Sequence, residues 1–191
     1  MNTKKFSNLK SRTVESMLRI GRCCETGDGV GKDLAEAVKW YRMAAEEGLA
    51  EAAFELSKCY TFGFGVRKNR VTSSNWLRKA AEAGHVSAMV LLGLRYQWET
   101  GGGVDYNPRE AVKWFRRAAE LGNTDAMFEL GECYEKGFGV KKDCDEAYMW
   151  FCRAALTAPE DEEMYQKVQN QVFDPNLKAV REELLTGQLQ S

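Results

Sequence analysis

Long apolar runs are scarce in this sequence, and their absence excludes a membrane-spanning helix. The longest stretch without Asp, Glu, Lys or Arg covers residues 83–94, twelve residues, whereas a bilayer-spanning helix needs roughly 20. Residues 1–12 carry Lys and Arg with no apolar run behind them, so the pattern of a secretory signal is missing. We therefore expect no membrane partner and a cytoplasmic location.

An excess of basic residues is also missing. Lys and Arg number 27 against 28 Asp and Glu, a formal net charge of −1. Nucleic-acid affinity comes largely from clustered cations that face phosphates. The charge balance therefore argues against a nucleic-acid partner, including the RNA that some helical repeat proteins read.

Histidine and cysteine are too few and too scattered for the usual metal and disulfide chemistry. The only histidine, His85, follows a glycine between two repeating segments, and we expect it to be solvated. Six cysteines in 191 residues fall below the density of a disulfide scaffold. We expect no metal and no cofactor, and reduced core thiols, with Cys133 and Cys152 as the one pair that could still bond.

What the sequence does contain is enough apolar residues for a core, at 44% of the chain, arranged in four similar segments. The segments cover residues 16–48, 52–84, 88–122 and 126–158. Each contains a Gly-Val turn and then a tryptophan four residues before an Ala-Ala pair; these tryptophans are Trp40, Trp76, Trp114 and Trp150. A fixed period of this kind is the signature of a repeat architecture.

Both halves of each segment predict a helix, because their apolar residues recur at three- and four-residue spacing. The second helix begins at a capping residue, Asp33, Asn107 or Asp143, with an acid three residues later. The second segment departs from this pattern, with Asn69 followed by Thr72. Each repeat is therefore predicted to be a helical hairpin, with the four tryptophans in its core.

These landmarks resemble the Sel-1-like repeat, a relative of the tetratricopeptide repeat. The resemblance is clearest in residues 126–134 and in Gly137-Phe138-Gly139-Val140 with the cap Asp143. It implies an all-α fold, a right-handed α-α superhelix or solenoid of hairpins. It also implies an adaptor that brings proteins together and is not an enzyme. Some cysteine-rich members are linked with penicillin binding, but this chain lacks their regular cysteine pairing.

The repeats divide the chain into three parts. Residues 1–12 form a basic segment, residues 13–158 hold the four repeats (13–48, 49–84, 85–122 and 123–158), and residues 159–191 are predicted to cap the last repeat. In the last part we expect one helix to about Val172 and another from Asp174 to Leu185, unless this part is a swapped element that recruits a partner.

One group of positions breaks the repeat pattern and is our candidate binding site. On the solvent side of the first helix, the first and fourth repeats have polar residues, while the third has Leu91, Leu94 and Trp98. Phe62 holds the last of these positions in the second repeat. Apolar clusters rimmed by polar groups mark interfaces. The alternative is that the long turn 98–106 folds back over Leu91 and Leu94 and buries them.

Acidic residues occupy neighbouring positions of the second and fourth repeats: Glu51 and Glu55, and Asp125, Glu129 and Glu132. The predicted partner is thus a protein or peptide with an apolar anchor and flanking Lys or Arg. The leading hypothesis is a non-catalytic interaction adaptor or scaffold that binds a peptide or protein surface in the concave groove of the repeats. The alternatives are a stoichiometric inhibitor or immunity protein for one toxin or enzyme, and, third, an enzyme such as a hydrolase of the penicillin-binding branch. The oligomeric state is left open.

Overall fold

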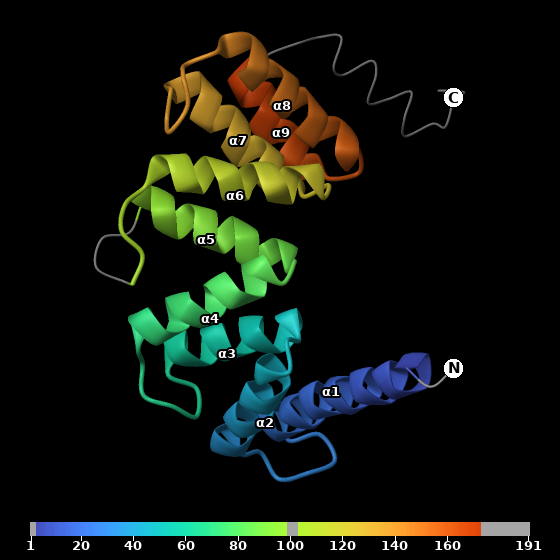
Figure 1. Cartoon of the computed structure of the whole chain (residues 1–191). Coiled ribbons are helices and arrows are strands. Elements are labelled where there is room, and N and C mark those ends of the chain that lie inside the picture. Colours follow the sequence, from blue (N-terminus) through green and yellow to red (C-terminus); the bar gives the residue numbers. More distant parts are fainter. Residues whose placement is uncertain (1–2, 99–102, 173–191) are drawn as a thin grey trace. The chain divides into compact units, whose positions relative to one another are not determined.

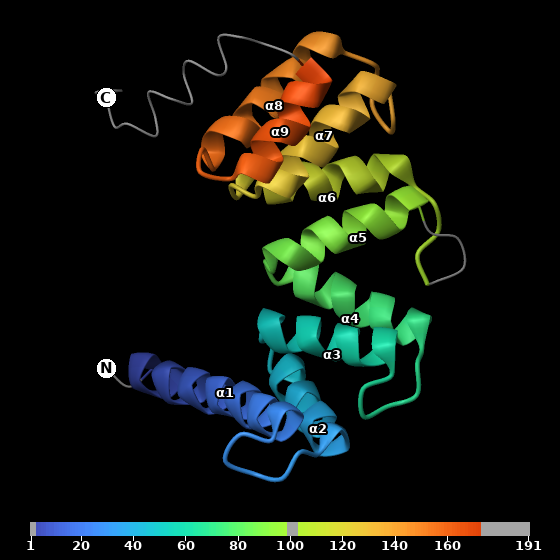
Figure 2. The same cartoon turned by 180° about the vertical axis from the view of Figure 1, so that it is seen from behind.

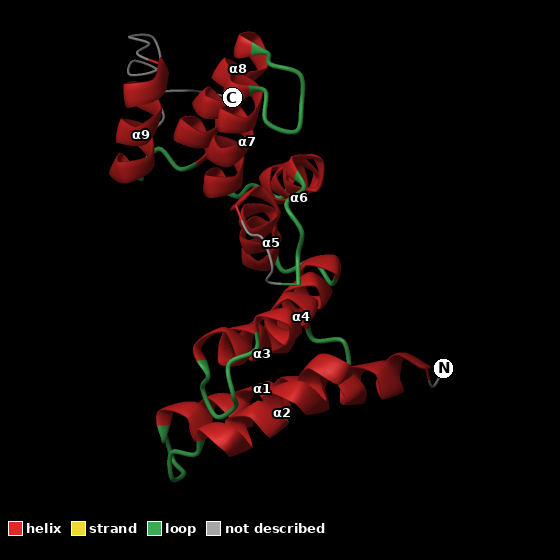
Figure 3. Ribbon diagram, turned by 90° about the vertical axis from the view of Figure 1, so that its left-hand side faces the viewer, coloured by secondary structure: helices red, strands yellow, loops and turns green. Residues whose placement is uncertain are grey.

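The computed structural model describes residues 3–98 and 103–172, and all of its regular structure is α-helical (Figure 1). Figure 3 shows only helices and connecting loops in this part of the chain. The predicted all-α repeat fold is confirmed. The helices are α1 (Thr3–Thr26), α2 (Leu34–Glu46), α3 (Ala50–Phe62), α4 (Arg70–Glu82), α5 (Val86–Trp98), α6 (Pro108–Glu120), α7 (Thr124–Lys136), α8 (Cys144–Thr157) and α9 (Glu162–Val172).

The helices fall into two compact units, and the chain passes from one to the other within α5. The first unit contains α1 to α4 and α5 as far as Leu92; residues 103–105 also belong to it. The second contains α5 from Gly93 onward and α6 to α9. In the first unit α1 packs on α2, and α3 packs on both α2 and α4; in the second, α7 packs on α6 and α8 (Figures 1 and 2).

Side-chain caps begin the second helix of every hairpin. The carboxylate of Asp33 accepts a hydrogen bond from the Glu36 N–H at 2.9 Å, and Asn107 and Asp143 do the same for the residue three positions on, at 3.3 and 3.1 Å. Asn69 caps α4 through the Thr72 N–H at 3.0 Å. The second repeat therefore keeps the cap although it lacks the acid, because the cap needs only the side-chain oxygen.

In each repeat, the residue that follows the tryptophan supplies the large side chain of the core. Tyr41, Phe115 and Phe151 are at most 2% exposed, while all four tryptophans are half-buried. The prediction of tryptophans in the core is thus only partly right. A Cβ on Gly93 would lie 2.5 Å from the Phe115 ring, so a glycine on the first helix makes room for each ring, and the neighbouring tryptophan turns toward the surface. Lys79, Arg117 and Arg153 cover three of these indoles at 4.1, 5.7 and 5.3 Å.

In the second, third and fourth repeats, the glycine of the Gly-Val pair packs against the repeat before it. A Cβ on Gly65 would lie 2.1 Å from the Leu34 carbonyl oxygen, and one on Gly103 would lie 2.8 Å from the Val71 Cα. Both glycines have positive φ, 67° and 82°. Only glycine combines that conformation with so close a backbone approach.

The last described helix, α9, packs on α8 and α7. Its Met164, Tyr165 and Val168 are buried, which is the arrangement of a helix that covers the last apolar face of a solenoid. Its described residues run to Val172. The predicted helix from Asp174 to Leu185 lies outside the described residues. No helix in residues 3–98 and 103–172 has the length and apolarity needed to cross a membrane.

Candidate functional site

The predicted apolar patch of the third repeat lies along α5. Leu91 and Trp98 are 41% and 67% exposed, and Leu94, between them, is half-buried. The opposite face of α5 holds the repeat in the core, with Met89 and Leu92 completely buried. Helical spacing thus separates a core face from an accessible apolar face on one helix. Of the turn that was the alternative cover, residues 99–102 lie outside the described residues.

Trp98 belongs to an aromatic cluster that sequence reasoning missed. Its ring stacks on Phe138 with centroids 6.2 Å apart, and Tyr106 meets Phe138 edge-on at 6.0 Å. All three rings lie in the second unit, and Tyr106 is 52% exposed. The available signal was a phenylalanine between two turn glycines, which the repeat pattern alone does not require.

In the first unit, Phe62 is one of a pair of exposed aromatics. It is 54% exposed and stacks on Phe64, which is 44% exposed, with ring centroids 5.5 Å apart. Phe64 has the same position between two turn glycines as Phe138. A phenylalanine therefore recurs at this turn position in both units, exposed at Phe64 and half-buried at Phe138.

The acidic residues of the first unit are already paired within the fold. Glu51 accepts a hydrogen bond from Arg22 at 2.6 Å and lies 2.9 Å from the His85 ring nitrogen Nε2. Glu55 pairs with Lys58 at 2.5 Å. Glu51 therefore joins neighbouring repeats, and the negative charge of both carboxylates is partly offset.

The sequence predicted a solvated His85, and this prediction is wrong. In the structure His85 is a structural residue. Its side chain is only 14% exposed, and its ring stacks on Phe54 with centroids 4.2 Å apart. Nδ1 accepts a hydrogen bond from the Ala88 N–H at 3.1 Å, which leaves Nε2 to donate to Glu51. The residue caps α5 much as Asn123 caps α7, and the additional contacts come from α3, which the local sequence does not reveal.

In the second unit, Glu132 pairs with Lys136 at 2.7 Å, whereas Asp125 is exposed. Glu129 is half-buried, and burial followed by the nearby charge of Glu132 raises the pKa of its carboxyl. The acidic positions of this unit thus differ in character, with Glu129 the least favourably ionised.

The prediction of core thiols is only partly right, because Cys24, Cys59 and Cys133 are buried whereas Cys144 is exposed. None of the six cysteines forms a disulfide, Cys133 and Cys152 included. Burial raises the pKa of Cys59 to about 11 and that of Cys133 to about 12, and a protonated thiol is a poor nucleophile and metal ligand. Within the described residues there is no group of three or more His, Cys, Asp or Glu side chains that could hold a metal ion.

The hairpins are capped and pack on one another through turn glycines, and their exposed side chains vary from repeat to repeat. These features define an α-helical repeat protein. The Sel1 repeat matches residues 14–49, 50–85, 86–123 and 124–156. The chain therefore belongs to the Sel1 repeat family, whose members are generally protein-interaction scaffolds and typically non-catalytic.

Solved structures agree with this assignment. The chain is similar to c5321, a protective antigen of uropathogenic Escherichia coli with an SLR fold, at 32% identity and a TM-score of 0.69 over 74% of this chain and 30% of c5321. A Sel1 repeat protein from Oxalobacter formigenes is 36% identical, with a TM-score of 0.63 over 74% of this chain and 56% of that protein. Cysteine rich protein B of Helicobacter pylori shares the fold at 24% identity and a TM-score of 0.52, over 71% of this chain and 94% of that protein.

The chain thus spans about a third of c5321 and just over half of the Oxalobacter protein. No curated protein sequence matches it.

Proposed function

We propose that this chain is a non-catalytic interaction adaptor that binds an apolar segment of a partner protein on the exposed face of α5. The observation that carries the proposal is the exposure of Leu91 and Trp98, 41% and 67%. The other repeats have different residues at the positions of Leu91, Leu94 and Trp98. These are Arg19, Arg22 and Thr26 in the first repeat, Glu55, Lys58 and Phe62 in the second, and Glu129, Glu132 and Lys136 in the fourth. The fold thus works with polar residues at most of these positions, which supports a role in binding.

The aromatic cluster supports an anchor site at one end of this face. Trp98 lies against Phe138, so its ring is partly ordered before a partner arrives. A pre-positioned aromatic side chain costs less entropy on binding than a free one. Large exposed aromatics are also the residues that dominate binding energy in interfaces.

The proposed partner segment carries Lys or Arg beside its apolar anchor. Glu51 and Glu55 supply the complementary charge in the first unit, and Glu129 and Glu132 supply it in the second. Because Glu51, Glu55 and Glu132 already have cationic neighbours, we expect the charges to affect association rate and selectivity more than affinity. Phe62 is proposed as a further anchor and is tested separately by Phe62→Ser.

Selection of random dodecapeptides on phage against the wild-type chain tests the proposal. We expect enriched peptides that combine an aromatic or aliphatic residue with Lys or Arg. In the double variant Leu91→Glu/Trp98→Ser their affinity should fall by about tenfold or more. Leu94 is left intact because it is half-buried, and a charge there would combine loss of binding with loss of stability.

The matched control is Leu121→Glu/Met149→Ser, which changes two apolar side chains that are 57% and 64% exposed elsewhere. This variant should bind the selected peptides like the wild type. Equal binding by both double variants, or selection without an apolar motif, would contradict the proposal. A very tight one-to-one complex with a single natural partner would instead indicate the inhibitor or immunity function.

A further inference from the structure

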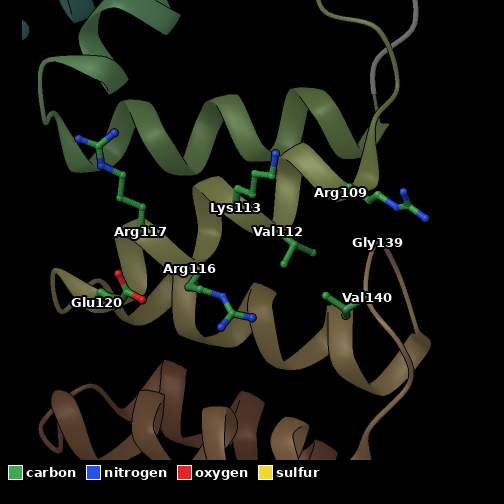
Figure 4. A pocket seen from close by; sticks show the side chains of 8 residues that line it. All are labelled: Arg109, Val112, Lys113, Arg116, Arg117, Glu120, Gly139 and Val140. Atoms are coloured by element: carbon green, nitrogen blue, oxygen red, sulfur yellow. The ribbon is translucent and has the colours of Figure 1, made fainter.

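A second surface, of opposite charge, lies in the unit formed by α6 to α9. Here α6 and the turn before α8 enclose a groove of about 510 Å³, within the roughly 300–1,000 Å³ of ligand pockets. Val112 from α6 and Val140 from the turn approach each other at its centre, as Figure 4 shows. Four cationic side chains line it: Arg109, Lys113, Arg116 and Arg117.

The cations of the groove are only partly satisfied by the fold. Lys113 pairs with Glu110 at 2.5 Å, and Arg116 donates a hydrogen bond to the Tyr134 hydroxyl at 2.5 Å. In the described part of the chain, neither Arg109 nor Arg117 forms an ion pair. They mark the two ends of the groove in Figure 4. The groove therefore presents two guanidinium groups, available for pairing, on either side of an aliphatic centre.

The other repeats show that the fold does not need this charge. All four positions are basic in the third repeat alone. The equivalent residues are Ala35, Lys39, Arg42 and Met43 in the first repeat, Val71, Asn75, Arg78 and Lys79 in the second, and Asp145, Met149, Cys152 and Arg153 in the fourth. Since the hairpins form equally well with these residues, folding does not explain the cluster.

Part of the cluster is unfavourable for α6 itself, although Arg117 lies in the last turn, where the helix dipole favours a cation. Arg109 lies in the first turn, where the positive end of the helix dipole favours acids. Arg109 and Lys113, and likewise Lys113 and Arg117, are four residues apart, and like charges at that spacing repel across one helix face. An anionic ligand would remove this repulsion.

We propose that the α6 groove binds an acidic segment of a partner protein. An aliphatic side chain of the segment packs on Val140, beside Val112, which is only 5% exposed, and carboxylates on either side pair with Arg109 and Arg117. Arginine forms bidentate pairs with carboxylates and is weakly hydrated, so it suits this contact. This groove takes acidic ligands, whereas the α5 face is proposed for basic ones, so the two surfaces bind different segments.

The lining favours a peptide over a nucleic acid. Among the described residues no aromatic side chain lines the groove, although stacking on such rings supplies much of the affinity for single strands. Glu120, at the same end as Arg117 (Figure 4), would repel a continuous phosphate chain. An acidic peptide can place an uncharged residue beside Glu120, whereas a phosphate backbone carries a charge at every step.

The test uses a fluorescein-labelled octapeptide of glutamates around a central Leu-Leu pair. Its binding to the full chain is measured by fluorescence anisotropy. There are three comparison probes. One peptide has Lys in place of Glu, a second peptide has Ser in place of Leu, and the third probe is an oligothymidylate of similar length. We expect the acidic peptide with leucines to bind most tightly and its affinity to fall as salt is added. Absence of binding up to millimolar peptide, or equal binding of the Lys peptide, would overturn the proposal.

Two double variants with the same charge change localise the site. Arg109→Ala/Arg117→Ala should weaken binding of the acidic peptide by about tenfold or more, because it removes both proposed charged contacts. The control Lys39→Ala/Arg153→Ala also removes two cations. Arg153 covers Trp150 at 5.3 Å as Arg117 covers Trp114 at 5.7 Å, so the control matches the structural loss too. It should bind within about twofold of the wild type.

Equal losses in the two double variants would show general electrostatic attraction and overturn the proposal. Tighter binding of oligothymidylate with the same dependence on Arg109 and Arg117 would overturn it in favour of a nucleic-acid surface. Thermal melting monitored by circular dichroism confirms that each variant is folded. The variant Leu91→Glu/Trp98→Ser should bind the acidic peptide normally, so the result does not depend on the α5 proposal.

Discussion

Gly139 lies directly against the backbone carbonyl of Pro108, the first residue of α6. A Cβ on Gly139 would stand 2.2 Å from the Pro108 oxygen, far inside van der Waals contact. Gly29 holds the same position in the first of the four repeats, and a Cβ added there would have nothing within 4 Å. The glycine is therefore needed for the approach of one repeat to another as well as for its own turn.

Comparison of Gly139→Ala with Gly29→Ala separates these two requirements. The φ angles are nearly equal, 72° and 74°, so both variants bear the left-handed backbone cost of roughly 1–2 kcal/mol. Gly139→Ala should lose about 1–3 kcal/mol more, because the methyl group pushes the turn away from α6. Urea unfolding measures both free energies. Equal losses would mean that the turn can move without cost.

The close contact of Gly131 with Phe151 predicts a compensating pair of substitutions. A Cβ on Gly131 would lie 2.6 Å from the ring, so Gly131→Ser should destabilise the chain by about 1–3 kcal/mol. The second repeat has Ser57 and Leu77 at these positions. The double variant Gly131→Ser/Phe151→Leu should thus be more stable than the sum of its single variants predicts. Additive losses in a double-mutant cycle would contradict direct contact between the two positions.

His85 should contribute more to stability than an ordinary helix cap. Asn123→Ala removes only the cap of α7, typically about 1 kcal/mol. His85→Ala removes the cap of α5, the Glu51 hydrogen bond and the Phe54 stack together, so its loss of unfolding free energy should be larger. His85→Asn should recover the cap alone and fall between the wild type and His85→Ala. Equal losses of unfolding free energy in the two alanine variants would show that His85 acts only as a helix cap.

The contribution of Glu129 to the free energy of unfolding should become less favourable as the pH rises. Because burial raises the pKa of its carboxyl above the ordinary 4.5, the folded chain holds the proton more tightly than the unfolded chain. The favourable contribution is complete below pH 4.5 and is lost as the pH rises through the higher folded pKa. Glu129→Gln, which stays neutral, should therefore raise the melting temperature at neutral pH and have little effect at about pH 4.

The charged groups around Glu129 define the control for this measurement. They are Glu132, Lys136, Asp125 and Lys167. Glu132→Gln removes the 2.7 Å pair with Lys136 and should not raise the melting temperature at neutral pH. A gain for Glu129→Gln that is as large in acid as at neutral pH would show that packing, and not ionisation, causes it.

Much of the fold could be predicted because its determinants are local. The cap at Asp143 depends on a residue three positions away, and the helix spacing depends on residues within one or two turns. The prediction for the tryptophans was only partly right because Trp150 and Phe151 are adjacent and similarly apolar. Which ring turns inward is decided by Gly131 on the facing helix.

The candidate site was harder to predict because its contacts join separate repeats. The exposure of Leu91 and Trp98 agrees with their positions on the helix, but Phe138 beside Trp98 comes from the next repeat. Similarly, Glu51 has an acidic sequence position, yet Arg22, 29 residues earlier, and His85, 34 residues later, offset its charge. Side-chain pairing over such separations depends on how the repeats pack.

The amino-acid sequence by itself determined the all-α fold, the period of the four hairpins, their caps and the glycines of their turns, since each of these follows from spacing within one segment. Only the tertiary structure decided which aromatic rings are buried, which acids are already paired, and that Val140 closes the groove beside Arg109 and Arg117. These features arise where one repeat meets another, and the free energy of those contacts depends on distances between side chains that a linear pattern does not specify.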